Sequence, residues 1–296
     1  MNKSLKTAGI ILLVLALVAG LSATAARLLR KASPRQTLKA EDGRAIFCEE
    51  LSFFGSGGKI YGKVYKPYDT LGRKPVLVYC HDLGGNYNEG KYICETVAKK
   101  GMVAYSFDFT GGSPESRSAG TLSEVSVRTE VADLKAVVVR LLKEDFTEKR
   151  SIYLVGKGLG GAVAGLVASE LKKDIAGVVF ISARFNIEEF SNETYPKVRN
   201  IPDTTFVNGV AVGKKFFTDA RDIKIFRKMK RYDGPALVIH GTADTVVPID
   251  FAEKANKVLS GCRLERIDGA GHELGSRYSS KVLRMTMDFL QENVKL

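Results

Sequence analysis

Four short turns in this 296-residue sequence carry residue types that can do chemistry. Each combines glycines with histidine, aspartate or lysine, and they read HDLGGN from His81, GKGLGG from Gly156, HGTADTVVP from His240 and DGAGHE from Asp268. Glycines in such a turn let backbone N–H groups point toward a pocket, which is what binding an oxyanion requires. Histidine and aspartate are residue types that accept, donate or orient protons.

The elements around these turns predict how they are brought together. Strand-like runs cover Val76–Cys80, Met102–Phe107, Ile152–Val155, Ile175–Ser182, Ala236–His240 and Leu264–Ile267. Helix-like stretches lie between them, the clearest being Val127–Lys143 with one apolar face. Strands alternating with helices predict an α/β fold with a doubly wound, mainly parallel sheet. Ligand sites in such sheets gather at the carboxyl ends of the strands, where the four turns fall.

The stretch Leu154–Val163, LVGKGLGGAV, fits two patterns. One is the G-x-G-x-x-G fingerprint of a dinucleotide site. That site follows the first strand of its domain, and an acidic residue ends the next strand. Here the glycines follow a late strand, and the next strand ends in Ser182, Ala183 and Arg184. The second pattern, G-x-S-x-G with Gly158 at its centre, is therefore favoured.

Taken together, the four turns resemble those of the α/β-hydrolase superfamily, particularly its esterase, lipase and peptidase-like members. HDLGGN resembles the H-G-x-x-G-N oxyanion loop, with Asp82 where glycine is commoner, and GKGLGG resembles the nucleophile elbow. GTADTVVP resembles the turn of the triad acid, GAGH resembles the loop of the base, and the chain order is the superfamily's. The resemblance covers residues 45–292. It predicts a hydrolase domain over 45–296 with a cap insertion over about 186–231.

The resemblance also implies roles for single residues. Asp244 would be the triad acid and His272 the base, and the N–H groups of Leu83 and Leu159 would form the oxyanion hole. Gly158 stands at the position of the nucleophile. Glycine has no side chain that could attack a carbonyl, so no acyl-enzyme can form there. The resemblance implies no metal and no organic cofactor.

Three hypotheses on function therefore stay open. The protein is a hydrolase, esterase- or lipase-like by descent, that cleaves a carboxylic ester or amide through water activated by His272 or a displaced serine. Alternatively, it is a pseudoenzyme that binds a small acyl or apolar ligand or a protein partner. The third hypothesis is that the protein is an ordinary serine esterase, and that a change of one base in codon 158 has replaced its serine by glycine. On the sequence alone, Gly158→Ser is expected to restore esterase activity. Candidate displaced serines are Ser106, Ser113 and Ser182.

The N-terminal segment accounts for most of the net charge of +12. Residues 1–40 hold seven basic residues and no acidic one, flanking the uncharged stretch Thr7–Ala26. This pattern predicts a single-pass membrane anchor over 1–30 and a linker over 31–44, and it does not indicate nucleic-acid binding. A cleaved signal peptide of a secreted protein is the alternative. The side of the membrane that the domain faces stays open.

Further residues receive structural interpretations. His81 and His240 are expected to bond the backbone near strand ends, and Asp108 to brace a loop. The four cysteines, at positions 48, 80, 94 and 262, have no metal-ligand spacing and are expected to be buried thiols. Residues 221–231 are predicted to form a basic amphipathic helix packed through Ile223, Phe226 and Met229.

Overall fold

The computed structural model of the protein describes residues 36–39, 45–68 and 71–294. The chain divides into two compact units, Met1–Gln36 and Thr37–Leu296, and everything below concerns the second. The predicted anchor over 1–30 and most of the predicted linker lie outside the described residues. Within the described ranges, no helix combines the length and the apolar character that crossing a membrane needs.

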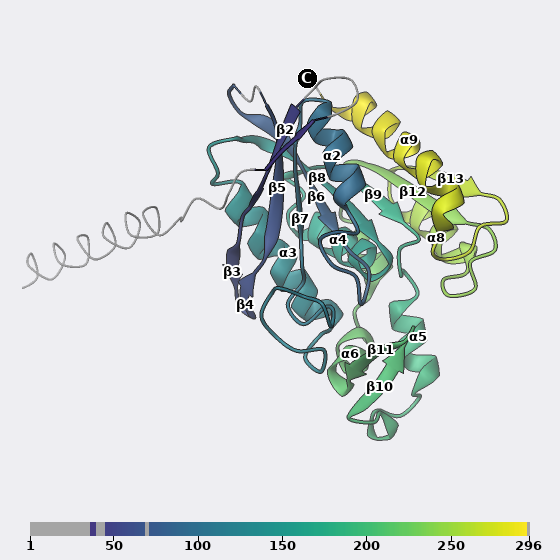
Figure 1. Ribbon diagram of the computed structural model, residues 1–296. Coiled ribbons are helices and arrows are strands. Elements are labelled where there is room, and N and C mark those ends of the chain that lie inside the picture. The colour runs from purple at the N-terminus through teal and green to yellow at the C-terminus, as the bar shows by residue number, and fades with distance from the viewer. Residues whose placement is uncertain (1–35, 40–44, 69–70, 295–296) are drawn as a thin grey trace, which may run out of the picture. The chain divides into compact units, whose positions relative to one another are not determined.

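A nine-stranded sheet forms the centre of this unit, in the order β1-β2-β5-β7-β6-β8-β9-β12-β13 (Figure 1). Neighbouring strands run parallel throughout the part of the sheet with the order β7-β6-β8-β9-β12-β13. Strand β5 pairs antiparallel with both β2 and β7. The predicted mainly parallel, doubly wound sheet is confirmed. The strands are β1 Gln36–Lys39, β2 Ala45–Glu50, β5 Gly62–Pro67, β6 Lys74–Cys80, β7 Val103–Phe107, β8 Thr147–Lys157, β9 Ile175–Ile181, β12 Pro235–Gly241 and β13 Gly261–Ile267. A separate hairpin pairs β3 Phe53–Gly55 with β4 Gly58–Ile60.

Helices cover both faces of the sheet, and each face has its own apolar core (Figure 1). One core includes side chains of α3 Val127–Leu141, α4 Gly158–Glu170 and α8 Ile249–Val258. The other includes side chains of α2 Lys91–Lys99 and α9 Gly275–Asn293. Helix α4 is buried on all sides because β8 and β9 cover one of its faces and helices, among them α3, cover the others. A Cβ on Gly160 would lie 2.3 Å from the His81 carbonyl oxygen, so this close approach requires glycine.

The region from 186 to 231 contributes a small group of elements of its own. It contains α5 Ile187–Thr194, a 3₁₀ turn at Val198–Asn200, the hairpin β10 Thr204–Val207 with β11 Val210–Gly213, α6 Lys214–Ala220 and α7 Ile225–Met229. A Cβ on Gly84 in the HDLGGN turn would lie 2.5 Å from Val210 Cγ2. The β10–β11 hairpin therefore packs directly on that turn, in the position of a cap.

The helix predicted over 221–231 is wrong in extent. Lys224 has a left-handed backbone conformation, with φ of +53°, and only Ile225–Met229 is helical. The Lys224 backbone N–H donates to Glu188 Oε2 and its ammonium group lies 2.8 Å from Glu188 Oε1. These contacts with α5 replace the helical hydrogen bonding that the periodicity of the segment predicts.

Candidate active site

The parallel sheet brings the four turns to one edge. The HDLGGN turn follows β6, and Gly158 opens α4 directly after β8. Asp244 follows β12, and His272 follows β13. Since β8 and β12 flank β9, and β6 and β13 lie beyond them, the carboxyl ends of these strands face a common space.

Asp244 and His272 form a hydrogen-bonded pair in this space. His272 Nδ1 lies 2.8 Å from Asp244 Oδ2. The backbone N–H groups of Val246 and Val247 donate to Asp244 Oδ1 at 2.9 and 2.8 Å. Burial raises the pKa of Asp244, but His240, His272 and the Val247 N–H outweigh it and hold that pKa well below its usual range. Asp244 is thus a fixed carboxylate that orients the imidazole of His272.

Gly158, at the predicted nucleophile position, has an unusual backbone conformation and no side chain. Its φ is +50°, in the left-handed region that glycine tolerates best. A Cβ on Gly158 would lie 2.0 Å from both Cγ and Oδ1 of Asp82. The space that a nucleophilic side chain would take is therefore occupied by the carboxyl group of Asp82.

The Asp82 carboxylate also fills the predicted oxyanion hole. Its Oδ1 accepts hydrogen bonds from the Leu83 and Leu159 backbone N–H groups, both at 2.7 Å. These are the two N–H groups that the sequence predicts for an oxyanion. The other oxygen, Oδ2, lies 3.7 Å from His272 Nε2. Asp82 thus lies between the oxyanion donors and the Asp244–His272 pair.

The sequence interpretation missed this role of Asp82. The available signal was a pair of departures from the superfamily pattern, aspartate at 82 and glycine at 158. The structure shows that the two departures are sterically complementary, since the side chain added at one position uses the space freed at the other.

Electrostatics keep Asp82 and His272 charged. Burial raises the pKa of Asp82, but its interaction with His272, the charge of Arg184 and the Leu159 N–H lower it overall. Burial lowers the pKa of His272, but Asp244 and Asp82 outweigh that effect and raise this pKa to about 9. At neutral pH the site holds an imidazolium between two carboxylates.

This charge state predicts how stability depends on pH. The pKa of His272 rises from 6.5 to about 9 on folding, so the charged ring stabilises the folded domain. That contribution is complete below pH 6.5 and is lost as the pH rises to about 9. We expect the difference in free energy of unfolding between wild type and His272→Gln to shrink by up to about 3 kcal/mol over this range, measured by urea unfolding. A difference that stays constant would contradict the assigned ion pairs.

The remaining predicted residues have structural contacts. His81 Nδ1 lies 2.6 Å from the Asp82 carbonyl oxygen, and its Nε2 accepts from the Phe109 N–H at 3.1 Å. His240 Nε2 bonds the Val247 carbonyl oxygen at 2.8 Å and lies 3.2 Å from Asp244 Oδ2. The carboxylate of Asp108 accepts from the Tyr87 and Arg117 N–H groups and braces their loops.

The candidate displaced serines have other surroundings. Ser106 Oγ donates to the Tyr87 carbonyl oxygen, and Ser113 Oγ accepts from the Glu115 N–H. Ser182 is buried, and its Oγ has no hydrogen-bond partner among the described residues. Over the same part of the chain, no hydrogen bond joins any of these serines to His272. Three of the four thiols are buried, and Cys262 is half-buried.

Asp82, His272 and Glu273 bring three possible metal-ligand atoms within 4.8 Å of one another. However, Lys157 Nζ lies 2.6 Å from Glu273 Oε2, and His272 is itself charged. Because these cations already balance the carboxylates, the three residues suit ion pairing better than metal binding. The expectation that the site uses no metal or organic cofactor stays a prediction.

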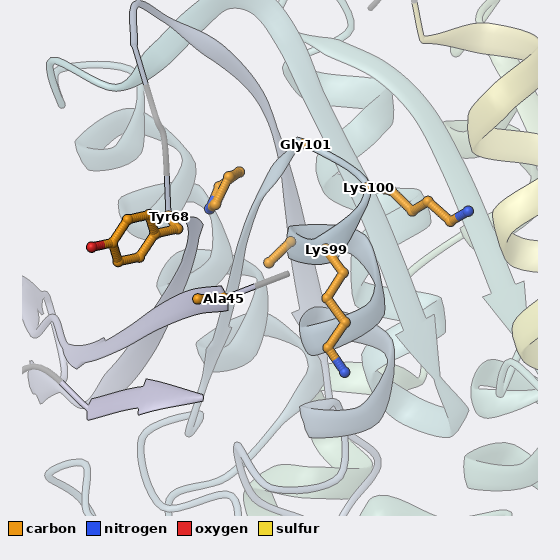
Figure 2. Close-up of a pocket in the computed structure, with 7 residues that line it drawn as sticks. Ala45, Tyr68, Lys99, Lys100 and Gly101 are labelled. Atoms are coloured by element: carbon orange, nitrogen blue, oxygen red, sulfur yellow. The ribbon is translucent and has the colours of Figure 1, made fainter. Parts of the chain in front are cut away.

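Figure 2 shows residues that line a hollow of about 470 Å³. Its lining joins the start of β2, the end of β5 and the turn after α2, with Ala45, Pro67, Tyr68, Ala98, Lys99, Lys100 and Gly101. Gly101 precedes β7, so the hollow lies at the amino ends of the parallel strands. It is therefore separate from the cluster around Asp82.

Comparison with known proteins supports the fold. Residues 72–211 match the family model described as serine aminopeptidase, S33. A putative esterase/lipase of Mycoplasma pneumoniae is 24% identical over 235 residues, which cover 66% of this chain and 81% of that protein. A putative non-heme chloroperoxidase of Synechocystis is 29% identical over 119 residues, but the match spans only 38% of this chain and 41% of that protein.

Solved structures show the same fold. Est1E from Butyrivibrio proteoclasticus with bound ferulic acid superposes with a TM-score of 0.75 at 22% identity, covering 82% of this chain and 98% of that one. A monoacylglycerol lipase of Paleococcus ferrophilus gives a TM-score of 0.60 at 18% identity, covering 79% and 99%. The chain has the α/β-hydrolase fold, and the family model matched over 72–211 supports its resemblance to that superfamily. The proteins that it resembles include a putative esterase/lipase and a monoacylglycerol lipase.

Proposed function

We propose that the domain is a hydrolase whose nucleophile is the carboxylate of Asp82, with His272 as the proton-transfer group and Asp244 as its orienting acid. One observation carries this proposal: the Asp82 carboxylate occupies the space of the missing elbow side chain. One of its oxygens is held by two backbone N–H groups, and the other faces His272 Nε2. Carboxylates serve as nucleophiles in covalent catalysis when they are ionised and fixed in place.

This arrangement favours displacement at a saturated carbon over serine-type acyl transfer. The N–H groups that would stabilise a substrate oxyanion are already bound to Asp82 Oδ1. Asp82 Oδ2 can instead form a bond to a carbon while that carbon's bond to a leaving group breaks, and the leaving group keeps the electron pair. A leaving oxygen requires a proton from water on the far side of the carbon, because it departs opposite to Asp82 Oδ2 and His272 Nε2.

The second half of the reaction uses the same groups. Water attacks Cγ of the Asp82 ester, and Oδ1 becomes an oxyanion that is already bonded to Leu83 and Leu159. Alkylation removes the charge of Asp82, one of the two carboxylates that raise the pKa of His272. The ring therefore releases its proton to solvent, and the neutral ring accepts the proton from the attacking water and returns one to the departing alkoxide. The sum is an alkyl halide plus water giving an alcohol plus HX, or an epoxide plus water giving a diol.

The substrate class is therefore a small molecule with a leaving group on a saturated carbon, such as an epoxide or an alkyl halide. The ester or amide hydrolysis expected from the sequence, through a displaced serine or through water activated by His272, needs a free oxyanion hole, and Asp82 Oδ1 already binds its two N–H groups. The complementarity of Asp82 and Gly158 also accounts for the glycine without an altered base in codon 158.

Isotope transfer tests the proposal directly. A single turnover of styrene oxide or 1-bromobutane in water enriched in ¹⁸O should place the heavy isotope in Asp82, because water attacks the carboxyl carbon. Mass spectrometry of the peptide that contains Asp82 measures this, and Asp108 is a buried aspartate that should stay unlabelled. Turnover with the isotope in the product alone would contradict a covalent Asp82 ester.

A second candidate is a pseudoenzyme that binds a small acyl or apolar ligand, or a protein partner, without turnover. The closure of the site favours it, since the side chains of His272 and Asp82 are only 5% and 11% exposed. The hairpin residue Val210 also covers the turn at Gly84. Under this alternative, neither substrate would be turned over and Asp82 would carry no isotope.

A further inference from the structure

Arg184 is a buried arginine next to the candidate site. It follows β9 and is only 1% exposed. Its backbone N–H donates to the Gly158 carbonyl oxygen at 2.8 Å, which places it beside the elbow. Two residues further along the chain, the side-chain amide of Asn186 donates a hydrogen bond to the Val246 carbonyl oxygen, in the turn that carries Asp244. Arg184 thus lies where the elbow and the acid turn meet.

Two nitrogens of the Arg184 guanidinium are buried without an acceptor. Nε and Nη2 have no hydrogen-bond partner among the residues that the structure describes. These two nitrogens form one side edge of the planar group, and their N–H bonds run parallel. That edge matches the two oxygens of a carboxylate, which accept such a pair of hydrogen bonds together. Buried donors of this kind are normally paired, so the edge is suited to a ligand.

The surrounding charges favour an anion with a single charge. Asp82, Asp244 and Glu273 are the carboxylates that act electrostatically on Arg184, and the first two also face the charged His272. With Lys157 paired to Glu273, three positive groups (Arg184, His272 and Lys157) balance these three carboxylates, so a singly charged anion is opposed less than a doubly charged phosphate. The Phe190 ring, with its centroid 5.5 Å from Arg184 Cζ, adds an apolar wall.

We propose that Arg184 binds the carboxylate group of a small organic acid through its Nε and Nη2 edge. The inference deepens the proposed function and rests on it, because it makes the substrate an acid that carries its leaving group near the carboxylate. Arg184 is covered in this structure, and α5 begins at Ile187, directly after it. Binding at this edge therefore requires the cap elements starting with α5 to move away.

Calorimetric titration with butyrate and its neutral analogue butyramide tests the site. We expect the wild type to bind butyrate, and Arg184→Met to bind it about 10- to 100-fold more weakly. Arg184→Lys keeps the charge without the paired edge and should also bind more weakly. Arg199→Met, on the exposed surface of the cap, is the matched control and should bind butyrate like the wild type. The affinity for butyramide should not depend on Arg184.

Two results would overturn the inference. One is wild-type protein that does not bind butyrate, and the other is Arg184→Lys and Arg184→Met variants that bind it as the wild type does. The Asp82→Asn variant separates this inference from the proposed function. It lacks the nucleophile, so it should not turn over substrate. It also lacks one charge that repels an anion, so it should bind butyrate at least as tightly as the wild type. Isotope transfer to Asp82 without Arg184-dependent binding would leave the proposed function standing and remove this inference alone.

Discussion

The paired substitution Asp82→Gly with Gly158→Ser should convert the domain into a serine esterase. Asp82→Gly frees the Leu83 and Leu159 N–H groups for a substrate oxyanion. Gly158→Ser then places a hydroxyl at the elbow, in the space that the carboxylate leaves. The Asp244–His272 hydrogen bond of 2.8 Å is untouched. We expect hydrolysis of short-chain p-nitrophenyl esters and labelling by a fluorophosphonate, both at least about 10³-fold above the wild type.

The single substitutions are the controls for this gain. Gly158→Ser alone would put a Cβ 2.0 Å from Asp82 Cγ, so it should destabilise the domain and gain no esterase activity. The structure thus argues against the sequence-based expectation that this single change restores activity. Asp82→Gly alone opens the oxyanion hole without adding a nucleophile. Adding His272→Ala to the pair should abolish the gain. Fluorophosphonate labelling of Gly158→Ser as rapid as that of the pair would refute the steric argument.

Replacing His272 by glutamine should trap the Asp82 ester. Displacement needs Asp82, while the water step needs a base at the position of His272 Nε2. With 1-bromobutane, whose leaving group needs no proton, His272→Gln should accumulate a protein heavier by one butyl group. Steady turnover should fall by at least about 10³-fold. Intact-protein mass spectrometry gives the adduct, and peptide mapping gives its position.

Matched variants make the trapping experiment decisive. Asp82→Asn combined with His272→Gln should form no adduct, because the nucleophile is missing. Asp250→Asn changes an exposed aspartate on α8 and should turn over like the wild type. An adduct on any residue other than Asp82 would rule out the proposed nucleophile.

The fold and the placement of the turns could be predicted because their causes are local. Strand-like apolar runs and glycine-rich turns alternate along the chain, and a parallel sheet then brings the turns to one edge. The resemblance to the superfamily then assigned Asp244 and His272 as partners, although they lie 28 positions apart. The same resemblance implied that Leu83 and Leu159 would present their N–H groups to one point.

The role of Asp82 could not be predicted in this way. The direction of its side chain depends on the packing of α4 against the end of β6, which joins residues 77 positions apart in sequence. A motif comparison treats aspartate at 82 and glycine at 158 as two separate losses. Only their positions in space show that one side chain fills the volume of the other. The helix predicted over 221–231 failed for a similar reason, since Glu188 lies 36 residues from Lys224.

The steric exclusion between positions 82 and 158 also restricts the evolutionary history of this site. The superfamily pattern has glycine at position 82 and serine at position 158. With the Asp82 side chain in its present direction, a Cβ at position 158 would lie 2.0 Å from Asp82 Cγ, so aspartate and serine together require that side chain to turn away. A path in which serine is lost first avoids this clash. An ancestor with glycine at both positions would have had an open oxyanion hole and no nucleophile, and the carboxylate would have been a later acquisition.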